Sequence, residues 1–176
     1  MLAAAAIVPA ALAGTSVAAN ASTTAPSQHG QHGQHERHGY RPQRLQPQTF
    51  IIPMNGNSNT NPVHAYGPIH GTGTDISKSD TLDVFTFRHG AVSVQHTSVA
   101  NVQPKVNYRT CTATINASGT WKITAGTHAY RDARGQGTFR FNEFAKLART
   151  SHGQCNLNAN PVYATGKVVA TGQASV

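Results

Sequence analysis

Apolar and polar residues alternate over much of the chain, with the two-residue period that β-strands impose on side chains. In the segment 81–88, Asp83, Phe85 and Phe87 fall on one side of the strand, and the residues between them fall on the other. Comparable segments occur at 63–70, 91–99, 108–116, 120–124, 135–141 and 162–171. Glycine, proline and asparagine separate these segments, so the sequence predicts about eight short strands in a sandwich or a barrel.

Several boundaries of these strands can be predicted locally. His89-Gly90 predicts the turn of a hairpin between 81–88 and 91–99, because Gly supplies the positive φ that such turns need. Pro53 should end a short edge strand that begins at Phe50. Turns or bulges are expected at 71–75 and 117–119. Residues 141–149 fit either a continued strand or a helix, because their apolar residues satisfy both spacings.

The first 49 residues differ in composition from the rest. Residues 1–21 are apolar and rich in alanine, and Ala19-Asn20-Ala21 fits the cleavage site of a signal peptide. A signal peptide should open with Lys or Arg, but this segment opens with Met1-Leu2, which suggests that the true start lies upstream or that the chain is truncated. Residues 22–49 are rich in Gln, Gly, His, Pro and Ser and predict a disordered linker. We therefore expect a secreted protein whose β-domain spans 50–176. We expect no transmembrane anchor, because the apolar run in 1–21 is too short and too rich in small residues to be one.

The chain is basic, with fourteen Lys and Arg against six Asp and Glu and a formal net charge of +8. Such an excess is typical of proteins that contact polyanions. We expect a weak polyanion or cell-surface contact through the tail that holds Arg37, Arg41 and Arg44; the alternative is that the charge serves solubility alone. The other basic residues are scattered and do not interleave with aromatic residues, so no nucleic-acid partner is expected.

Four histidines of the linker, His29, His32, His35 and His38, recur at every third residue. In a polyproline II conformation they would lie on one side of the chain. Imidazoles placed in this way suit loose binding of Cu(II), Ni(II) or Zn(II). The alternative is a polar spacer that becomes cationic in acid. The spacing matches no fixed zinc motif, and we expect no cofactor.

The two cysteines, Cys111 and Cys155, predict a disulfide, because an even pair in an exported chain is normally oxidised. The chain-entropy model gives such a bridge a stabilisation of roughly 4 kcal/mol. A redox or nucleophilic role is the alternative, but the sequence holds no CxxC motif and no local activating motif.

The segment Gly119–Phe141, GTWKITAGTHAYRDARGQGTFRF, predicts a strand, a glycine-bearing turn and a second strand. Within it, Ile123–Gly135 resembles the signature shared by plant allene oxide cyclases, dirigent proteins and secreted bacterial relatives of the same barrel, which reads loosely ITGGTGxYxxARG. The segments 71–75 and 80–87 resemble the same families more weakly.

This resemblance implies an all-β fold, a closed antiparallel eight-stranded barrel, with a cavity at one mouth. The plant relatives hold apolar or phenolic small molecules there, and eight strands leave room for side chains or for one small ligand. His128 stands where the family usually has Gly, and His enters the left-handed region only at some cost. Either the turn is slightly remodelled or His128 makes a compensating contact; the simpler alternative is a tolerated turn residue. The catalytic groups of the plant enzymes lie outside the matched segment and do not carry over.

Candidate chemistry rests on polar residues that share a face with apolar ones. If Phe85 and Phe87 point into the barrel, Asp83 becomes a carboxylate in an apolar lumen, with a raised pKa and the ability to act as an acid or base. His96, which alternates with Val92 and Val94 on the adjacent strand, could be its partner.

Phe85, Phe87 and Glu143, which shares a face with Phe139 and Phe141, are the candidate ligand-binding residues. The alternative is that the phenylalanines pack outward, or that Asp83 is a solvated residue at the barrel rim.

Two hypotheses for the function follow. The first is a non-catalytic exported barrel that holds a small apolar ligand or serves at a surface. The second is a cyclase- or isomerase-like enzyme in which a carboxylate of the lumen acts on a reactive small molecule. An enzyme needs a convergent polar group of perturbed pKa in a pocket that fits a substrate, so a packed lumen would argue for the first hypothesis.

Overall fold

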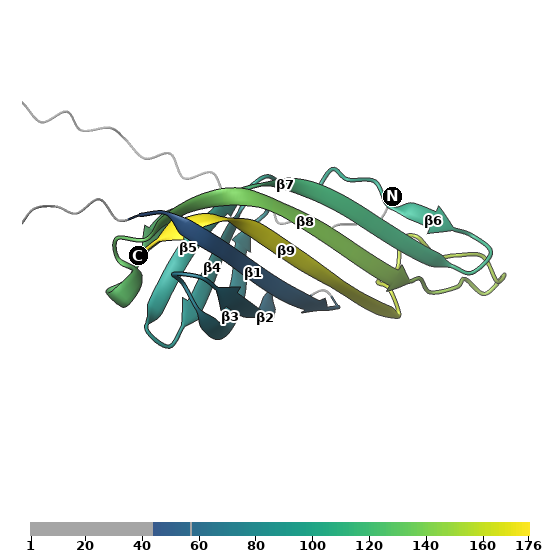
Figure 1. Cartoon of the computed structure of the whole chain (residues 1–176). Coiled ribbons are helices and arrows are strands. Elements are labelled where there is room, and N and C mark those ends of the chain that lie inside the picture. The colour runs from purple at the N-terminus through teal and green to yellow at the C-terminus, as the bar shows by residue number, and fades with distance from the viewer. Residues whose placement is uncertain (1–43, 57) are drawn as a thin grey trace, which may run out of the picture. The chain divides into compact units, whose positions relative to one another are not determined.

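The computed structural model describes residues 44–56 and 58–176 (Figure 1). The predicted signal peptide, most of the predicted linker and its four histidines lie outside these residues. Regular structure within them is β apart from one 3₁₀ turn, η1 (His128–Tyr130). The strands are β1 (Gln46–Asn55), β2 (Thr60–Tyr66), β3 (Gly71–Ser79), β4 (Leu82–Phe87), β5 (Gly90–His96), β6 (Lys105–Asn107), β7 (Thr112–Gly126), β8 (Arg134–Lys146) and β9 (Tyr163–Ser175).

Eight of these strands close into an antiparallel barrel. They lie in the order β5-β4-β3-β2-β1-β9-β8-β7, and β5 then pairs with the second half of β7 to close the ring. The short strand β6 pairs instead with the first residues of β7, outside the ring. The structure thus confirms the predicted closed eight-stranded barrel.

Aromatic side chains fill the barrel interior. Phe50 is fully buried, and its ring meets Phe85 and Trp121 edge to face, with ring centroids 5.2 Å and 5.4 Å apart. The Trp121 Nε1–H donates to the backbone carbonyls of Thr138 and Thr171 at 3.2 Å each. Glycine makes this position available, because a Cβ added at Gly172 would lie 2.8 Å from the indole.

Strands β7, β8 and β9 are longer than the barrel needs and continue past one of its mouths (Figure 1). We call this extension, residues 105–118 and 140–169, the arm. Its own core is small: Cys111, Ala113 and Leu147 are buried there, with a few half-buried neighbours. The arm therefore has little apolar area with which to stabilise itself.

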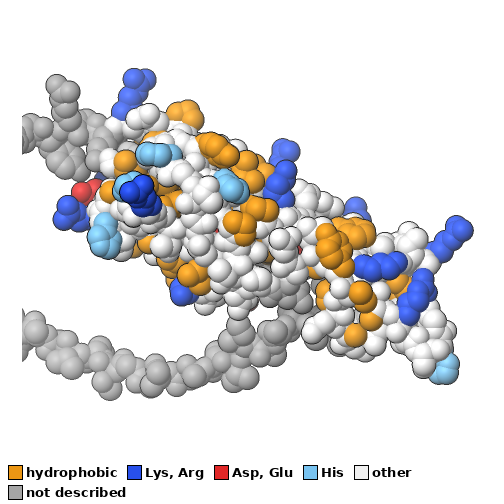
Figure 2. All heavy atoms as spheres, turned by 90° about the horizontal axis from the view of Figure 1, so that it is seen from below, with side chains coloured by type: hydrophobic (Ala, Val, Ile, Leu, Met, Phe, Trp, Pro, Cys, Tyr) orange, Lys and Arg blue, Asp and Glu red, His pale blue; other side chains and the backbone are white. Residues whose placement is uncertain are grey.

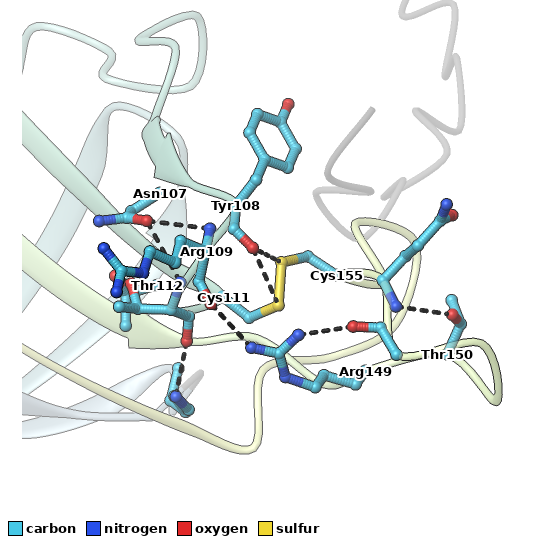
Figure 3. The surroundings of a disulfide bond; sticks show 12 residues. Asn107, Tyr108, Arg109, Cys111, Thr112, Arg149, Thr150 and Cys155 are labelled. Atoms are coloured by element: carbon cyan, nitrogen blue, oxygen red, sulfur yellow. Dashed lines mark hydrogen bonds between the residues drawn. A yellow bond between two sulfur atoms is a disulfide. The ribbon is translucent and has the colours of Figure 1, made fainter.

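Covalent and polar contacts secure the loops of the arm (Figure 3). Cys111 and Cys155 form the predicted disulfide, which joins the start of β7 to the loop between β8 and β9. The Arg149 guanidinium donates to the carbonyl of Arg109 at 3.0 Å and also to that of Gly153. The Lys146 ammonium donates to the carbonyl of Thr110 at 2.7 Å. These bonds tie together loops that are far apart in sequence.

Strand β1 differs from the sequence prediction at both ends. It begins at Gln46, so 46–49 belong to the barrel and not to the linker. The reason is Gln48, whose buried side chain accepts from the Ile69 N–H and donates to the Ile69 carbonyl, at 3.0 Å and 2.9 Å. Pro53 does not end the strand, and β1 lies between β2 and β9. Beyond Ile51 its register is with β9 alone, so the missing N–H of Pro53 faces no partner in β2.

Two predicted turns are strand interiors. Residues 71–75 belong to β3 and 117–119 belong to β7, which runs unbroken for 15 residues. Gly119 is needed there for space, because a Cβ would lie 2.7 Å from the Phe139 ring. The ambiguous segment 141–149 continues as strand through Lys146.

The hairpin of β4 and β5 is confirmed, but its turn is Arg88-His89, one residue earlier than predicted. Gly90 already pairs with Phe87 and still takes a positive φ of 149°. His128 takes a φ of 52°, in the left-handed region that favours Gly, and its Nδ1 lies 3.3 Å from Thr127 Oγ1.

Candidate functional site

A polar cluster lies on the inner face of the barrel, at the mouth from which the arm extends. It is formed by Asp75 of β3, Asp83 of β4 and His96 of β5. The strand register places Asp75 opposite Phe85, and Asp83 opposite Val94, so both carboxyl groups share the face that carries buried apolar side chains. The cluster therefore sits at the edge of the hydrophobic core.

Asp83 and His96 contact each other, as the alternation of their strands suggested. His96 Nε2 lies 3.2 Å from Asp83 Oδ2, and less than a fifth of either side chain is exposed. His96 Nδ1 lies 3.0 Å from the Thr97 carbonyl, which can only accept, so Nδ1 carries a proton. A hydrogen bond between Nε2 and Oδ2 then requires a further proton, carried either by Nε2 or by Oδ2.

The hydrogen bond with Asp83 raises the pKa of His96, outweighing burial, which lowers it. The backbone bond to Thr97 and the nearby Asp75 charge raise it further. His96 also meets the Phe139 ring edge to face, with centroids 5.9 Å apart. The imidazole is thus held in place on two sides.

Asp75 is the member of the cluster that sequence reasoning missed. Its side chain is 6 % exposed, and Oδ1 is buried with no hydrogen-bond partner. Burial raises its pKa to about 7; repulsion from Asp83 adds to this effect and His96 opposes it. The segment 71–75 was interpreted as a turn because of its glycines. Strand alternation would not have found it either, because Ile76, the one large apolar residue of 71–79, lies on the opposite face and pairs with Val84; only the register with β4 places Asp75 opposite Phe85.

Phe85 and Phe87, the candidate ligand-binding residues, are packed in the core. They are 3 % and 6 % exposed, and the Phe87 ring meets Tyr130 edge to face at 6.0 Å. Their inward orientation satisfies the condition under which Asp83 lies among apolar groups. Their rings pack against other core rings and do not line either of the hollows described below.

Glu143 lies on the inner face of the arm, in register with Ile115 and Gly166. Burial raises the pKa of its half-buried carboxyl, with no contribution from the charges of the mouth cluster. The structure therefore places Glu143 on the same face as Phe139 and Phe141, as predicted, but does not bring it into the cluster of Asp75, Asp83 and His96.

Two hollows mark the outer surface of the described residues. The larger, about 740 Å³, is an open groove over β5, β7, β8 and β9, and His96, Lys122 and Gln136 are among the residues that line it. The smaller, about 350 Å³, lies over β2 and β3, where His64 Nδ1 is 3.2 Å from Thr72 Oγ1. Both are open to solvent, and neither is lined by Asp75 or Asp83.

The metal hypothesis concerns His29, His32, His35 and His38, which lie outside the described residues. Within residues 44–56 and 58–176, no group of three or more His, Cys, Asp or Glu side chains is arranged to hold a metal ion. In the same part of the chain, no helix is long and apolar enough to cross a membrane.

The geometry thus offers a closed barrel, a polar cluster at one mouth and two open surface hollows as the basis for a functional assignment. The resemblance of Ile123–Gly135 to allene oxide cyclases and dirigent proteins remains a prediction. The chain matches no protein-family model, no curated protein and no solved structure.

Proposed function

We propose that the protein is an exported, non-catalytic binding module that meets its ligand on the outside of the barrel. The observation that carries this proposal is the filled interior. Phe50 is fully buried against Phe85 and Trp121, where a lumen ligand would have to lie. An apolar guest would displace rings whose burial stabilises the fold, each by about 1.5–3 kcal/mol.

Export is supported by two features. The Cys111–Cys155 disulfide is typical of oxidising compartments, and the alanine-rich segment 1–21 fits a signal peptide. We also propose that the protein belongs with the allene oxide cyclase and dirigent barrels. The closed eight-stranded barrel and the resemblance of Ile123–Gly135 to their signature support this proposal. N-terminal sequencing of the protein recovered from the medium should begin at Ser22; recovery of an uncleaved chain from the cytosol would contradict export.

The filled interior is tested with the full chain and its disulfide intact. Native mass spectrometry of the wild type should show no retained small molecule, and xenon should not bind. Phe85→Ala should open a cavity, cost about 3–5 kcal/mol in unfolding free energy and create xenon binding, since apolar cavities accept such guests. Phe144→Ala, at a ring that is 40 % exposed, is the matched control and should do neither. Stoichiometric retention of an apolar molecule by the wild type, weakened by Phe85→Ala, would contradict the proposal.

A second candidate function is acid–base chemistry at the mouth cluster, as in a cyclase or isomerase. It is favoured by the buried, unpartnered Oδ1 of Asp75 beside the Asp83–His96 pair, since perturbed carboxyls in such settings gather at functional sites. A fragment screen by NMR tests it, with wild type and Asp75→Asn side by side. Fragments that shift signals around Asp75 in the wild type alone would support this function, and an absence of such fragments would remove it.

A further inference from the structure

The outer face of the arm is a separate surface, distinct from the mouth cluster and from both hollows. Strand pairing arranges its residues in rows across β6, β7, β8 and β9. The rows, from the tip toward the barrel, are Asn107, Thr112, Lys146 and Tyr163; then Lys105, Thr114, Phe144 and Thr165; then Asn116, Asn142 and Lys167; then Ser118, Arg140 and Val169. The intervening rows point inward, as the buried Ala113 and half-buried Ala145 show.

This outer face carries positive charge only. Lys105, Lys146, Lys167 and Arg140 are all exposed on it, and it holds no Asp or Glu. Glu143 belongs to an inward row. Figure 2, a view from below, shows Lys and Arg side chains projecting at the end of the molecule that holds the arm. The four other acids of the described residues, Asp75, Asp80, Asp83 and Asp132, belong to the barrel. The face therefore attracts polyanions.

Two exposed aromatic rings lie among these cations. Phe144 is 40 % exposed and Tyr163 is 56 % exposed. Phe144 pairs with Thr165, and Tyr163 is two residues before it on the same side of β9, so the two rings are diagonal neighbours. Short polar side chains occupy most remaining positions, and Asn142 Nδ2 donates to Asn116 Oδ1 at 2.6 Å. Rings, amides and hydroxyls thus alternate with charges on one sheet face.

We propose that the outer face of the arm binds a linear acidic polysaccharide; the proposal rests on the assignment of the protein as an exported external binder. Each part of the face matches one chemical feature of such a polymer. The lysines and Arg140 pair with carboxylate or sulfate groups, and the rings of Phe144 and Tyr163 stack on the C–H faces of sugars. The amide and hydroxyl side chains occupy the positions between the cations, where they can form hydrogen bonds with the sugar hydroxyls.

Other occupants fit this face less well. A second copy of the chain would place cations against cations, which is repulsive. An anionic membrane would be met by a wider apolar patch than two rings with Asn and Thr between them provide. A single-stranded nucleic acid is bound by aromatic side chains that stack successive bases along a basic groove, whereas the two rings here lie side by side at one end of the face and the other rows carry none. A nucleic acid is therefore kept as an outcome of the test.

The experiment uses the full chain with the disulfide intact and titrates polygalacturonate, neutral dextran and a thymidine oligonucleotide at low and physiological salt. The wild type should bind polygalacturonate, more weakly as salt rises, and should not bind dextran. Lys105→Gln with Lys167→Gln should weaken binding by about threefold to tenfold, since each surface ion pair contributes modestly. The matched control is Lys78→Gln with Arg88→Gln, which removes two charges from exposed positions of the barrel that line neither hollow and should leave binding unchanged.

A tyrosine pair tests the stacking part. Tyr163→Ala should weaken binding by about fivefold through loss of the ring contact. Tyr66→Ala, on the barrel and 59 % exposed, should have no effect. Absence of polygalacturonate binding at low salt, equal losses in the barrel variants, or tighter binding of the oligonucleotide through the same residues would each overturn the proposal. These outcomes are independent of the xenon experiment on Phe85→Ala, which tests the filled interior of the barrel. Failure of the polysaccharide proposal can therefore be distinguished from failure of the proposed function.

Discussion

The barrel and the arm share three long strands, β7, β8 and β9, but they are stabilised in different ways. In the described residues one cluster of seventeen buried apolar side chains fills the barrel and includes Phe141 of the arm, whereas the separate cluster of the arm has three. The arm compensates with a disulfide and with Lys146 and Arg149 bonded to loop carbonyls. A sheet that extends beyond its core thus needs covalent and polar links, for the reason that small domains need them.

The two regions also differ in charge. The barrel holds four of the five acids in the described residues, including a buried carboxyl, and the arm presents lysines and arginines with exposed rings. The barrel therefore resembles a scaffold with a buried polar cluster at its mouth, and the arm resembles a contact surface. The predictions below test this contrast.

The largest expected effect is on the barrel core. Phe50→Ala removes a fully buried ring that meets Phe85 and Trp121, and should lower the unfolding free energy by about 3–5 kcal/mol. Phe144→Ala removes an arm ring that is 40 % exposed, and should cost less than about 1 kcal/mol. Urea unfolding measures both. Similar losses at the two positions would remove the contrast between core and arm.

The mouth cluster should make stability fall as pH rises. Burial raises the pKa of Asp75 from 3.8 to about 7 in the folded protein, whereas the unfolded chain loses this proton near 3.8. Between these values the folded state binds more protons, so stability decreases with increasing pH, by on the order of 4 kcal/mol over the window. The raised pKa of His96 acts in the same direction, because its stabilisation is present below the ordinary value of 6.5 and is lost as pH rises through its folded value.

Asp75→Asn separates these contributions, since the amide has no proton to lose. Relative to the wild type, the variant should gain stability steadily from about pH 4 to pH 8. Glu143→Gln, which removes a half-buried arm carboxyl whose pKa is also raised, is the comparison and should show a smaller gain of the same sign. Parallel stability curves for Asp75→Asn and wild type would show that Asp75 is ionised in the folded state.

Removal of the disulfide should affect the arm first. Cys111→Ala with Cys155→Ala is expected to cost about 2–4 kcal/mol, because the bridge closes a loop with a sequence separation of 44. The arm has few buried side chains with which to make up this loss. Thermal unfolding of the variant measures the cost, and an unchanged midpoint would show that the polar contacts of Lys146 and Arg149 suffice.

The smallest effect concerns the strand that joins the two regions. At Gly119, where β7 leaves the barrel, an added Cβ would lie 2.7 Å from the Phe139 ring and 2.8 Å from Thr97 Cβ. Gly119→Ala should therefore cost about 1–3 kcal/mol through overpacking. Ser118→Ala, at the exposed neighbouring position, should stay within about 0.5 kcal/mol of wild type. Equal stability of the two variants would mean that β7 shifts readily at this point.

Much of the barrel could be predicted from the sequence, because strand alternation is a local signal. Phe85 and Phe87 were placed on one face with Asp83, and the hairpin of β4 and β5 then made His96 a neighbour of that carboxyl. Asp75 could not be predicted, because the glycines beside it are typical of a turn, whereas Gly73 leaves space for the Phe87 ring inside a strand.

The arm could not be predicted, because its existence depends on pairing between distant strands. Neither the alternation of 108–116 nor that of 135–141 shows that β7 and β8 stay paired from Lys122–Gln136 to Thr112–Lys146. The cations and rings of the outer face are likewise scattered in sequence and meet only through register. For this reason the sequence indicated no interleaving of basic and aromatic residues.

Hydrogen exchange with the disulfide oxidised and reduced tests most directly the claim that the barrel is self-sufficient and the arm is not. On reduction, amides of the arm in 112–118 and 140–146 should lose protection by orders of magnitude, while those around Phe50, Phe85 and Trp121 keep theirs, since regions with few buried contacts open separately. Loss of protection in both regions together, at the same rate, would contradict the account and show that the barrel and the arm unfold as one unit.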